Sequence, residues 1–151
     1  GGRAEIMNEV SPLGKKVSQA GTLSGNPLAM AAGLEQLRLL SEEGAYERLE
    51  LACAQLEAGM RDNLKRLGLE YTINRVGAMM CLFFTREPVR GFADLAAVDL
   101  ERFSRYFWAC LERGVYLAPS QYECMFPSLA HSEADIEETL KVQYEALKAV
   151  H

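Results

Sequence analysis

The residues that first suggest chemistry lie in the stretch QAGTLSGNPLAM, which spans positions 19–30. Two glycines, two hydroxyl residues and an Asn-Pro step precede a run that has the pattern of a helix. Backbone N–H groups and hydroxyls gathered before a helix can bind an anion such as phosphate. Gly21 and Thr22 are therefore candidate anion ligands. The stretch also fits a plain loop in which Gly25 serves backbone geometry and Asn26 caps the helix.

The second candidate is Glu123, in the stretch SQYEC. Most glutamates are solvated surface charges. This one lies between Tyr122 and Cys124 in an apolar segment bounded by prolines, which is an unusual setting for a solvated charge. In a short strand, Tyr122 and Cys124 would share one face and Glu123 would share the other with Met125. We expect Glu123 to face a cavity or a further domain, with Ser120 either supporting it or closing a turn.

Hydrophobic periodicity predicts the elements that must position these residues. A short helical pattern covers residues 1–9, and a helix runs from Pro27 to near Gly44. A second helix covers 45–67, and two strands follow at 69–76 and 77–84. Further along the chain we expect a short helical turn within 85–98, a helix from Asp99 to Gly114, short strands and turns over 115–131, and a last helix that starts at Ser132 with Asp135 in its cap.

The apolar positions of these helices predict the core. Spacings of three or four residues assign the inward faces, and Trp108 is assigned to the core with them. The assigned positions are Tyr46, Leu49, Cys53, Leu56, Met60, Leu64 and Leu67 in the second helix, Leu100, Phe103, Phe107 and Leu111 in the third, and Ile136, Leu140, Tyr144 and Leu147 in the last.

The order of elements predicts an α+β fold, a sheet with helices packed on one side. The first 45 or so residues contain no predicted strand. A helix as rich in alanine and leucine as LAMAAGLEQLRLL should be covered on more than one side. We therefore expect a further piece of protein before Gly1, or a partner chain.

Composition narrows the class of function. The net charge of -5 and the lack of a basic stripe argue against nucleic-acid binding. No stretch approaches the ~18 apolar residues of a membrane span, and the N-terminus lacks the apolar region of a signal peptide. The four cysteines form no C-x-x-C pair, which favours buried free thiols and a cytoplasmic location. No metal site is expected, because the only histidines are His131, which we assign to a helix entry, and His151.

Four motifs together carry a family resemblance: GGRAEIM, QAGTLSGNPLAMAAG, ERGVYLAPSQYE and SLAHSEADIEET. With them the chain resembles the glutamate-1-semialdehyde 2,1-aminomutases, which belong to the class III aminotransferases and bind pyridoxal 5'-phosphate. AGTLSGNP is typical of the wider group, whereas GVYLAPSQYE followed by SLAH narrows the resemblance to the aminomutases. The resemblance extends from Gly1 to the last helix.

The resemblance implies a fold and a domain organisation. Residues 46–151 would form the C-terminal small domain of a fold-type-I enzyme, with a short, mainly antiparallel sheet. Residues 1–45 would be the end of the large cofactor-binding domain, including a phosphate-contact loop and an interdomain helix. The family's Schiff-base lysine precedes the GGR motif, so we expect this chain to be a C-terminal part that is inactive alone.

The resemblance also implies roles for the candidate residues. Gly21 and Thr22 would bind the cofactor phosphate of the neighbouring subunit in a homodimer. Glu123 would be catalytic, close to the lysine and the substrate amine, where a carboxylate can hold an ammonium group. The family pattern after PSQ is Phe-Glu-Ala and then a small residue, whereas this chain has Tyr122, Cys124 and Met125. That departure leaves the exact substrate open.

Two alternatives to the aminomutase assignment stay open. The chain would then come from another class III aminotransferase with a different amine substrate, or act as a non-catalytic dimerising or folding fragment. A Schiff-base lysine needs a desolvated pocket. The five lysines lie in a polar loop or at polar helix positions, so we expect none of them to serve: Lys15, Lys16, Lys65, Lys141 and Lys148.

Overall fold

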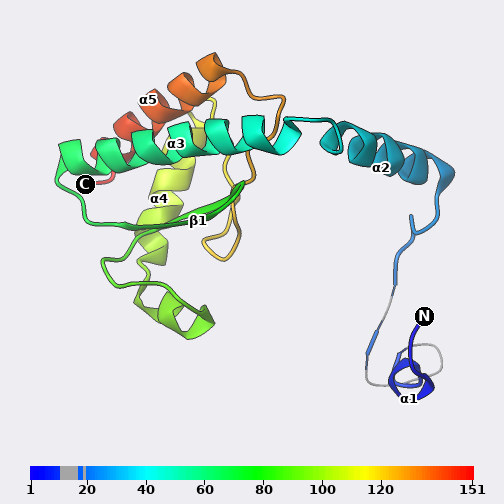
Figure 1. Cartoon of the computed structure of the whole chain (residues 1–151). Helices are drawn as coiled ribbons and strands as arrows, with labels where there is room; N and C mark the ends of the chain where they lie inside the picture. Colours follow the sequence, from blue (N-terminus) through cyan, green and yellow to red (C-terminus); the bar gives the residue numbers. More distant parts are fainter. Residues whose placement is uncertain (11–16, 19) are drawn as a thin grey trace. The chain divides into compact units, whose positions relative to one another are not determined.

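The computed structural model describes residues 1–10, 17–18 and 20–151. The chain divides into two compact units, Gly1–Glu42 and Glu43–His151. Figure 1 shows their helices and strands. In the described part of the chain, no helix is both long enough and apolar enough to cross a membrane.

The first unit contains two helices, α1 (Ala4–Met7) and α2 (Pro27–Leu40). Asn26 caps α2, because its side-chain oxygen accepts hydrogen bonds from the N–H groups of Leu28 at 3.0 Å and Ala29 at 3.2 Å. Pro27 takes the first helical position, where its missing N–H costs nothing. The predicted start of this helix is confirmed.

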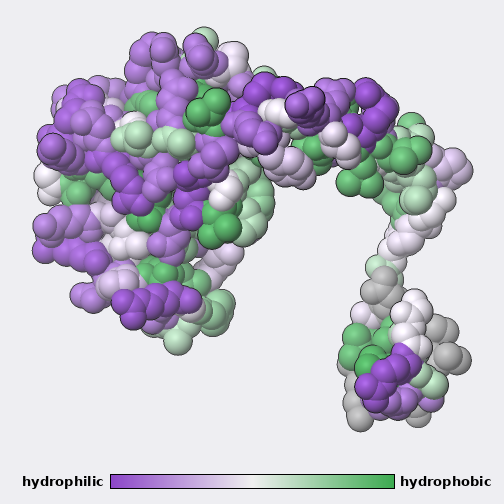
Figure 2. All heavy atoms as spheres, in the orientation of Figure 1, coloured by the Kyte–Doolittle hydropathy of each residue, from purple (hydrophilic) through white to green (hydrophobic). Residues whose placement is uncertain are grey.

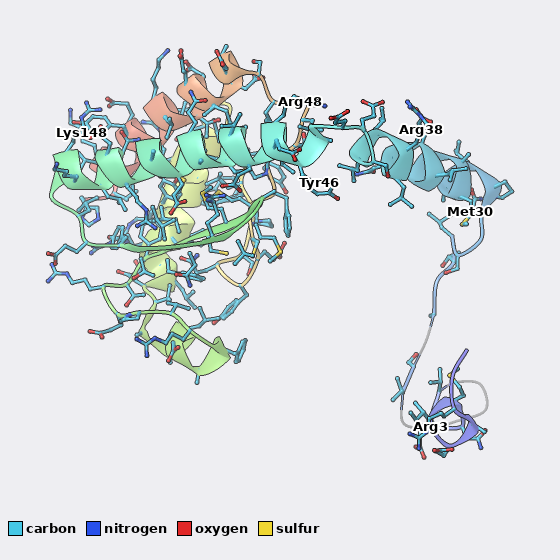
Figure 3. All side chains as sticks on the ribbon, in the orientation of Figure 1. Arg3, Met30, Arg38, Tyr46, Arg48 and Lys148 are labelled. Atoms are coloured by element: carbon cyan, nitrogen blue, oxygen red, sulfur yellow. The ribbon has the colours of Figure 1, made fainter. Side chains whose placement is uncertain are left out.

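The apolar side chains of α2 are not covered by their own unit. Leu28, Met30, Leu34 and Leu37 are 80, 62, 71 and 64% exposed. Figure 2 shows hydrophobic atoms gathered along one side of this helix, and Figure 3 labels Met30 among its projecting side chains. Large contiguous apolar patches are uncommon on free-standing soluble proteins. The helix therefore presents a face that its own unit does not bury.

The second unit holds the sheet and the core. Its elements follow the predicted order of helix, strand pair, short helical turn, helix and helix, so the chain combines helices with a short antiparallel sheet. They are α3 (Ala45–Leu67), β1 (Thr72–Val76), β2 (Met79–Phe83), the 3-10 helix η1 (Phe92–Ala97), α4 (Leu100–Leu111) and α5 (Glu133–Ala149).

The two strands pair in an antiparallel register that runs from Thr72 opposite Phe83 to Val76 opposite Met79. Gly77 makes the connecting turn in the left-handed region, with φ of 55°. Four consecutive residues of β2, 80–83, are buried. Because successive side chains of a strand point to opposite faces, both faces of β2 are covered, as its continuous apolar run predicted.

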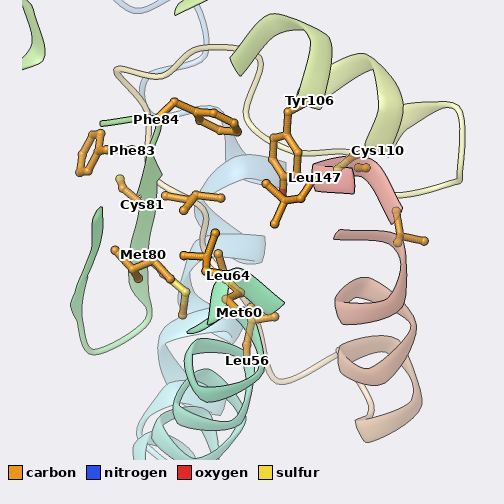
Figure 4. Packing of buried hydrophobic residues seen from close by; sticks show 14 of the residues in the cluster. Leu56, Met60, Leu64, Met80, Cys81, Phe83, Phe84, Tyr106, Cys110 and Leu147 are labelled. Carbon is orange, nitrogen blue, oxygen red and sulfur yellow. The ribbon is translucent and has the colours of Figure 1, made fainter. Parts of the chain in front are cut away.

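The core lies where α3, β2, α4 and α5 meet (Figure 4). In this view Leu64 and Met60 of α3 lie next to Met80 of β2, with Leu147 of α5 above them. The α3–α5 contact is the most extensive between elements. One side of α3 is therefore packed against both the sheet and the last helix.

A buried polar group also joins α3 to α5. Asn63, only 4% exposed, donates from Nδ2 to the carbonyl oxygen of Leu140 at 2.8 Å and to Oε1 of Gln143 at 2.9 Å. Such hydrogen bonds offset the cost of burying an amide. They also fix the alignment of the two helices.

Three predicted core positions are wrong. Trp108 is 57% exposed, Tyr46 is 63% exposed (labelled in Figure 3) and Leu100 is 44% exposed. In α4 the inward face carries Tyr106, Phe107 and Cys110. Trp108 is rotated about 200° from Tyr106 on a helix of 3.6 residues per turn, so it points away from the core. Tyr46 and Leu100 lie in the first turns of α3 (Ala45–Leu67) and α4 (Leu100–Leu111).

The capping residues that the sequence predicts are found at the other helix ends. Gly68 ends α3 in the left-handed conformation, with φ of 67°. The Asp99 carboxylate accepts the N–H of Arg102 at 2.9 Å and so caps α4. Ser132 and Asp135 form the expected capping box at α5.

Candidate functional site

The first candidate group, Gly21 and Thr22, lies in the first unit, just before α2. Residues 22–25 form a turn, closed by hydrogen bonds from Ser24 N to the Gly21 carbonyl and from Asn26 N to the Leu23 carbonyl, each 3.0 Å long. All residues from 20 to 39 are exposed. The helix that follows therefore starts at a fixed turn with accessible donors.

The turn leaves particular donors free. The Thr22 side chain makes no hydrogen bond with any residue in the described ranges, and neither does its backbone N–H. A Cβ at Gly21 would meet Oγ of Ser24 in its present position, so glycine lets the Ser24 hydroxyl lie against the backbone here. Hydroxyls and amides that converge on a glycine suit an anion with several oxygen atoms. By contrast, the Asn26 side chain is occupied in capping α2.

The second candidate residue, Glu123, lies in a turn of the second unit. The Glu123 N–H donates to the Ser120 carbonyl at 3.1 Å, and the Tyr122 N–H donates to Oγ of Ser120 at 3.2 Å. Ser120 thus closes the turn. Short strands over 115–131 are not formed; in this segment a single residue, Met125, pairs with the sheet. Prolines at 119 and 127 remove ladder donors on both sides, which leaves little room for a strand.

Gln121 and Met125, two positions before and two positions after Glu123, anchor the turn to β2. Gln121 is 4% exposed, and its Nε2 donates to the Leu82 carbonyl at 2.8 Å. Met125 exchanges both backbone hydrogen bonds with Met80, at 2.8 and 3.1 Å. Sequence reasoning missed Gln121, although a glutamine in a proline-bounded apolar segment is a signal of the same kind as Glu123. The anchors hold the backbone of the turn and leave the Glu123 side chain free.

Glu123 is exposed, and its carboxylate makes no hydrogen bond or ion pair with the residues that the structure describes. The predicted alternation is wrong, because a turn replaces the strand. Tyr122 is 56% exposed and stands 5.9 Å from the ring of Phe92, whereas Cys124 is half-buried against Cys81. The expectation that Glu123 faces a further domain stays a prediction.

A cavity of about 400 Å³ opens beside this turn, but Glu123 does not line it. Its walls include Cys124, Met125, His131 and Asp135. His131 accepts the Ser128 N–H at Nδ1, 3.0 Å away, and closes the turn before α5. This is the helix-entry role assigned from the sequence.

The lysines and the potential metal ligands of the described residues form no second site. Lys65, Lys141 and Lys148 are exposed, the last labelled in Figure 3, whereas Lys15 and Lys16 lie outside the described residues. No three potential metal ligands gather within the ranges that the structure covers. All four cysteines are free thiols, as predicted; Cys124 is half-buried and the others are buried, namely Cys53, Cys81 and Cys110.

Comparison with known proteins decides the family. A family profile described as aminotransferase class-III matches residues 1–147. The chain belongs to the class III aminotransferases. Within them it is 57% identical over 148 residues to glutamate-1-semialdehyde 2,1-aminomutase 2 of Brevibacillus brevis, covering 98% of this chain and 34% of that protein. It is 53% identical over 151 residues to the glutamate-1-semialdehyde 2,1-aminomutase of Chlorobium limicola, covering 100% of this chain and 35% of that one.

Solved structures agree with this placement. A glutamate-1-semialdehyde aminomutase from Pseudomonas aeruginosa is similar with a TM-score of 0.72 and 27% identity, over 87% of this chain and 29% of that chain. A transaminase with bound pyridoxal phosphate gives a TM-score of 0.69 and 26% identity, over 99% and 34%. The chain thus spans about a third of the length of the curated relatives that it matches.

Proposed function

We propose that this chain is the C-terminal part of a pyridoxal-phosphate-dependent aminomutase that converts glutamate-1-semialdehyde to 5-aminolevulinate in tetrapyrrole synthesis. The observation that carries the proposal is 57% identity across 98% of the chain to an aminomutase. Residues 46–151 would then be the small domain and residues 1–45 the end of the large one, a boundary three residues from the division between the two compact units. The exposed apolar face of α2 is consistent with such an attachment.

The chain's own groups fit the phosphate of this cofactor. The free hydroxyl and N–H of Thr22 and the close approach that Gly21 permits make a small anion cradle. In a homodimer these groups would hold the phosphate of the neighbouring subunit's cofactor. When bound, pyridoxal phosphate supplies the electron sink for chemistry at the carbon that carries the amine.

Glu123 would act on the substrate side. A carboxylate without an internal cation partner can bind the substrate ammonium and hold its position during the transfer of the amino group from C2 to C1. The anchors at Gln121 and Met125 keep the turn in place, so little conformational freedom is lost when substrate binds. Replacing the carboxylate by a neutral amide would keep the shape of the turn and remove the charge.

The first experiment asks whether the 151-residue chain carries the cofactor alone. The chain is incubated with pyridoxal phosphate and borohydride, and adducts are mapped by mass spectrometry. We expect only scattered labelling of the exposed lysines, because none of those described lies in a desolvated pocket. One stoichiometric, site-specific adduct that survives competition by free lysine would contradict this.

The second experiment uses a longer protein that contains this chain and converts the semialdehyde. Glu123→Gln should fold normally and lose turnover by ~10²-fold or more, as expected for a positioned charge. Glu145→Gln, an exposed glutamate on α5, is the matched control and should retain activity. Thr22→Ala should weaken cofactor binding, and Thr22→Ser should restore it. Unchanged kinetics in Glu123→Gln would remove Glu123 from the site.

A different class III aminotransferase is the second candidate, and one observation favours it. Tyr122, Cys124 and Met125 are larger than the residues usual around this glutamate, and Tyr122 stands exposed beside it. A product assay separates the two. An aminomutase forms 5-aminolevulinate from the semialdehyde alone, whereas an aminotransferase needs a second carbonyl substrate.

A third possibility is a non-catalytic fragment that serves only for dimerisation or folding. It requires that the chain self-associates and that no longer form of the protein shows turnover.

A further inference from the structure

The structure places two of the four cysteines directly opposite each other. Met80 of β2 and Met125 exchange both backbone hydrogen bonds, so they form a hydrogen-bonded pair of an antiparallel ladder. The next pair along such a ladder is Cys81 with Cys124. In that non-hydrogen-bonded position, Cα atoms approach to about 4.5 Å, which falls within the range that a disulfide spans.

The sulfur atoms already touch. Sγ of Cys81 lies 3.2 Å from Sγ of Cys124 and 3.7 Å from the carbonyl oxygen of Glu123. A disulfide requires about 2.05 Å, so the sulfurs need to approach by only about 1 Å, which side-chain rotation can supply without breaking the strand pairing. Cys53 and Cys110 sit on different helices, α3 and α4, and no sulfur partner is found for either among the described residues.

The two thiols differ in their access to solvent. Cys81 is 9% exposed, and burial together with its contact to Cys124 raises the pKa of its thiol to about 12. Cys124 is half-buried and lines the cavity of about 400 Å³. A small oxidant can therefore reach the Cys124 thiol first, because the Cys81 thiol is more deeply buried. The geometry, an accessible thiol with a second thiol 3.2 Å behind it, is that of an attacking and a resolving cysteine.

We propose that Cys81 and Cys124 form a reversible redox site whose oxidant is a small peroxide. The Cys124 thiol loses its proton, and its sulfur attacks one oxygen of hydrogen peroxide and breaks the O–O bond; a sulfenic acid forms, and the departing hydroxide takes a proton to leave as water. The Cys81 sulfur then attacks the Cys124 sulfur, the S–O bond breaks, and the leaving hydroxide takes the Cys81 proton to form a second water. Two thiols lose two electrons and two hydrogens in total, and one peroxide is reduced. A dithiol reverses the change.

Oxidation acts on the segment that carries Glu123. The bond ties the residue after Glu123 to β2 and removes the thiol hydrogen that Cys81 directs toward the Glu123 carbonyl. The register of Met80 with Met125 becomes covalently fixed. The redox site does not depend on the proposed function, because it is defined by the strand pairing alone.

The test uses the 151-residue chain at low micromolar concentration, with folding followed by far-ultraviolet circular dichroism. Hydrogen peroxide is added and then removed, the chain is denatured in acid, free thiols are alkylated and peptides are mapped. We expect a Cys81–Cys124 disulfide that dithiothreitol reverses, formed about tenfold faster than any modification of Cys53 or Cys110. Methionine oxidation is distinguished from disulfide formation because it adds the mass of one oxygen atom to the peptide.

Two variants complete the test. In Cys124→Ala, a change at a half-buried position, Cys81 should remain an alkylatable thiol after the same treatment. In Cys81→Ala, Cys124 should stop at the sulfenic acid, which dimedone traps. The proposal is overturned if the folded wild-type chain keeps both thiols alkylatable, if Cys124 is oxidised to the sulfinic acid without cross-linking, or if disulfides with Cys53 or Cys110 form equally fast.

Discussion

Replacing Asn63 by alanine should loosen the contact between α3 and α5. The side chain makes two hydrogen bonds, at 2.8 and 2.9 Å, to groups of α5, and it is 4% exposed. Each such bond contributes about 1 kcal/mol, and leaving buried Oε1 of Gln143 without its donor costs about 1 kcal/mol more. The better helix propensity of alanine returns about 0.5 kcal/mol. We expect Asn63→Ala to lower the free energy of unfolding by about 2–3 kcal/mol.

Urea denaturation followed by circular dichroism measures this loss as a lower midpoint at unchanged slope. Asn74→Ala is the matched control, since exposed Asn74 makes a single side-chain hydrogen bond, to the Val89 carbonyl at 2.7 Å. The control should lose about 0.5–1 kcal/mol. If Asn63→Ala loses no more than the control, the interhelical hydrogen bonds contribute nothing net, and apolar packing alone docks α5.

Three further predictions concern stability. Ion pairing with Arg75 and Arg61 holds the pKa of the Glu57 carboxyl below its ordinary value of 4.5, so this contribution to stability is present above that value and is lost as pH falls through the lowered pKa. Urea titrations between about pH 3 and pH 6 should therefore show a steeper acid loss in the wild type than in Glu57→Gln. Gly59→Ala should destabilise by about 1–2 kcal/mol in the same assay, because its Cβ would meet Leu140 Cδ2 at 2.6 Å, whereas Gly33→Ala on α2, with open space, should be neutral or stabilising. The Cys81–Cys124 bond closes a loop between residues 43 positions apart and should raise the free energy of unfolding by about 4 kcal/mol relative to the reduced chain; an unchanged urea midpoint would refute this.

Features that depend on a few neighbouring residues could be predicted from the sequence. Asn26, Asp99 and Ser132 cap their helices through hydrogen bonds to residues two or three positions away. Gly68 ends α3 for an equally local reason, its positive φ. Such signals need no knowledge of the rest of the fold, which is why helix boundaries were predicted more accurately than burial.

Features that depend on distant residues could not be predicted. Whether Trp108 is buried depends on which side of α4 faces the rest of the unit. The spacing of apolar residues in α4 is compatible with more than one buried side, and it did not identify the side that is buried. Gln121 gains its role from Leu82, 39 positions away. The turn at Glu123 was mistaken for a strand because alternation over three residues does not distinguish the two. The roles proposed for Thr22 and Glu123 rest on the family resemblance, and the structure adds only the donors of Thr22, unpaired within the described ranges, and the anchored turn at Glu123.

The pairing of Met80 with Met125 has a consequence for self-association. It covers the edge of β2, the more apolar of the two strands, at one position, on the side away from β1. The edge with no such bridge among the described residues belongs to β1, which has five residues and includes Asn74 and Arg75. Short edge strands with polar and charged side chains are poor templates for the addition of a strand from another molecule. Aggregation by strand addition should therefore be disfavoured in the folded unit, and contact with other chains should run through side-chain surfaces.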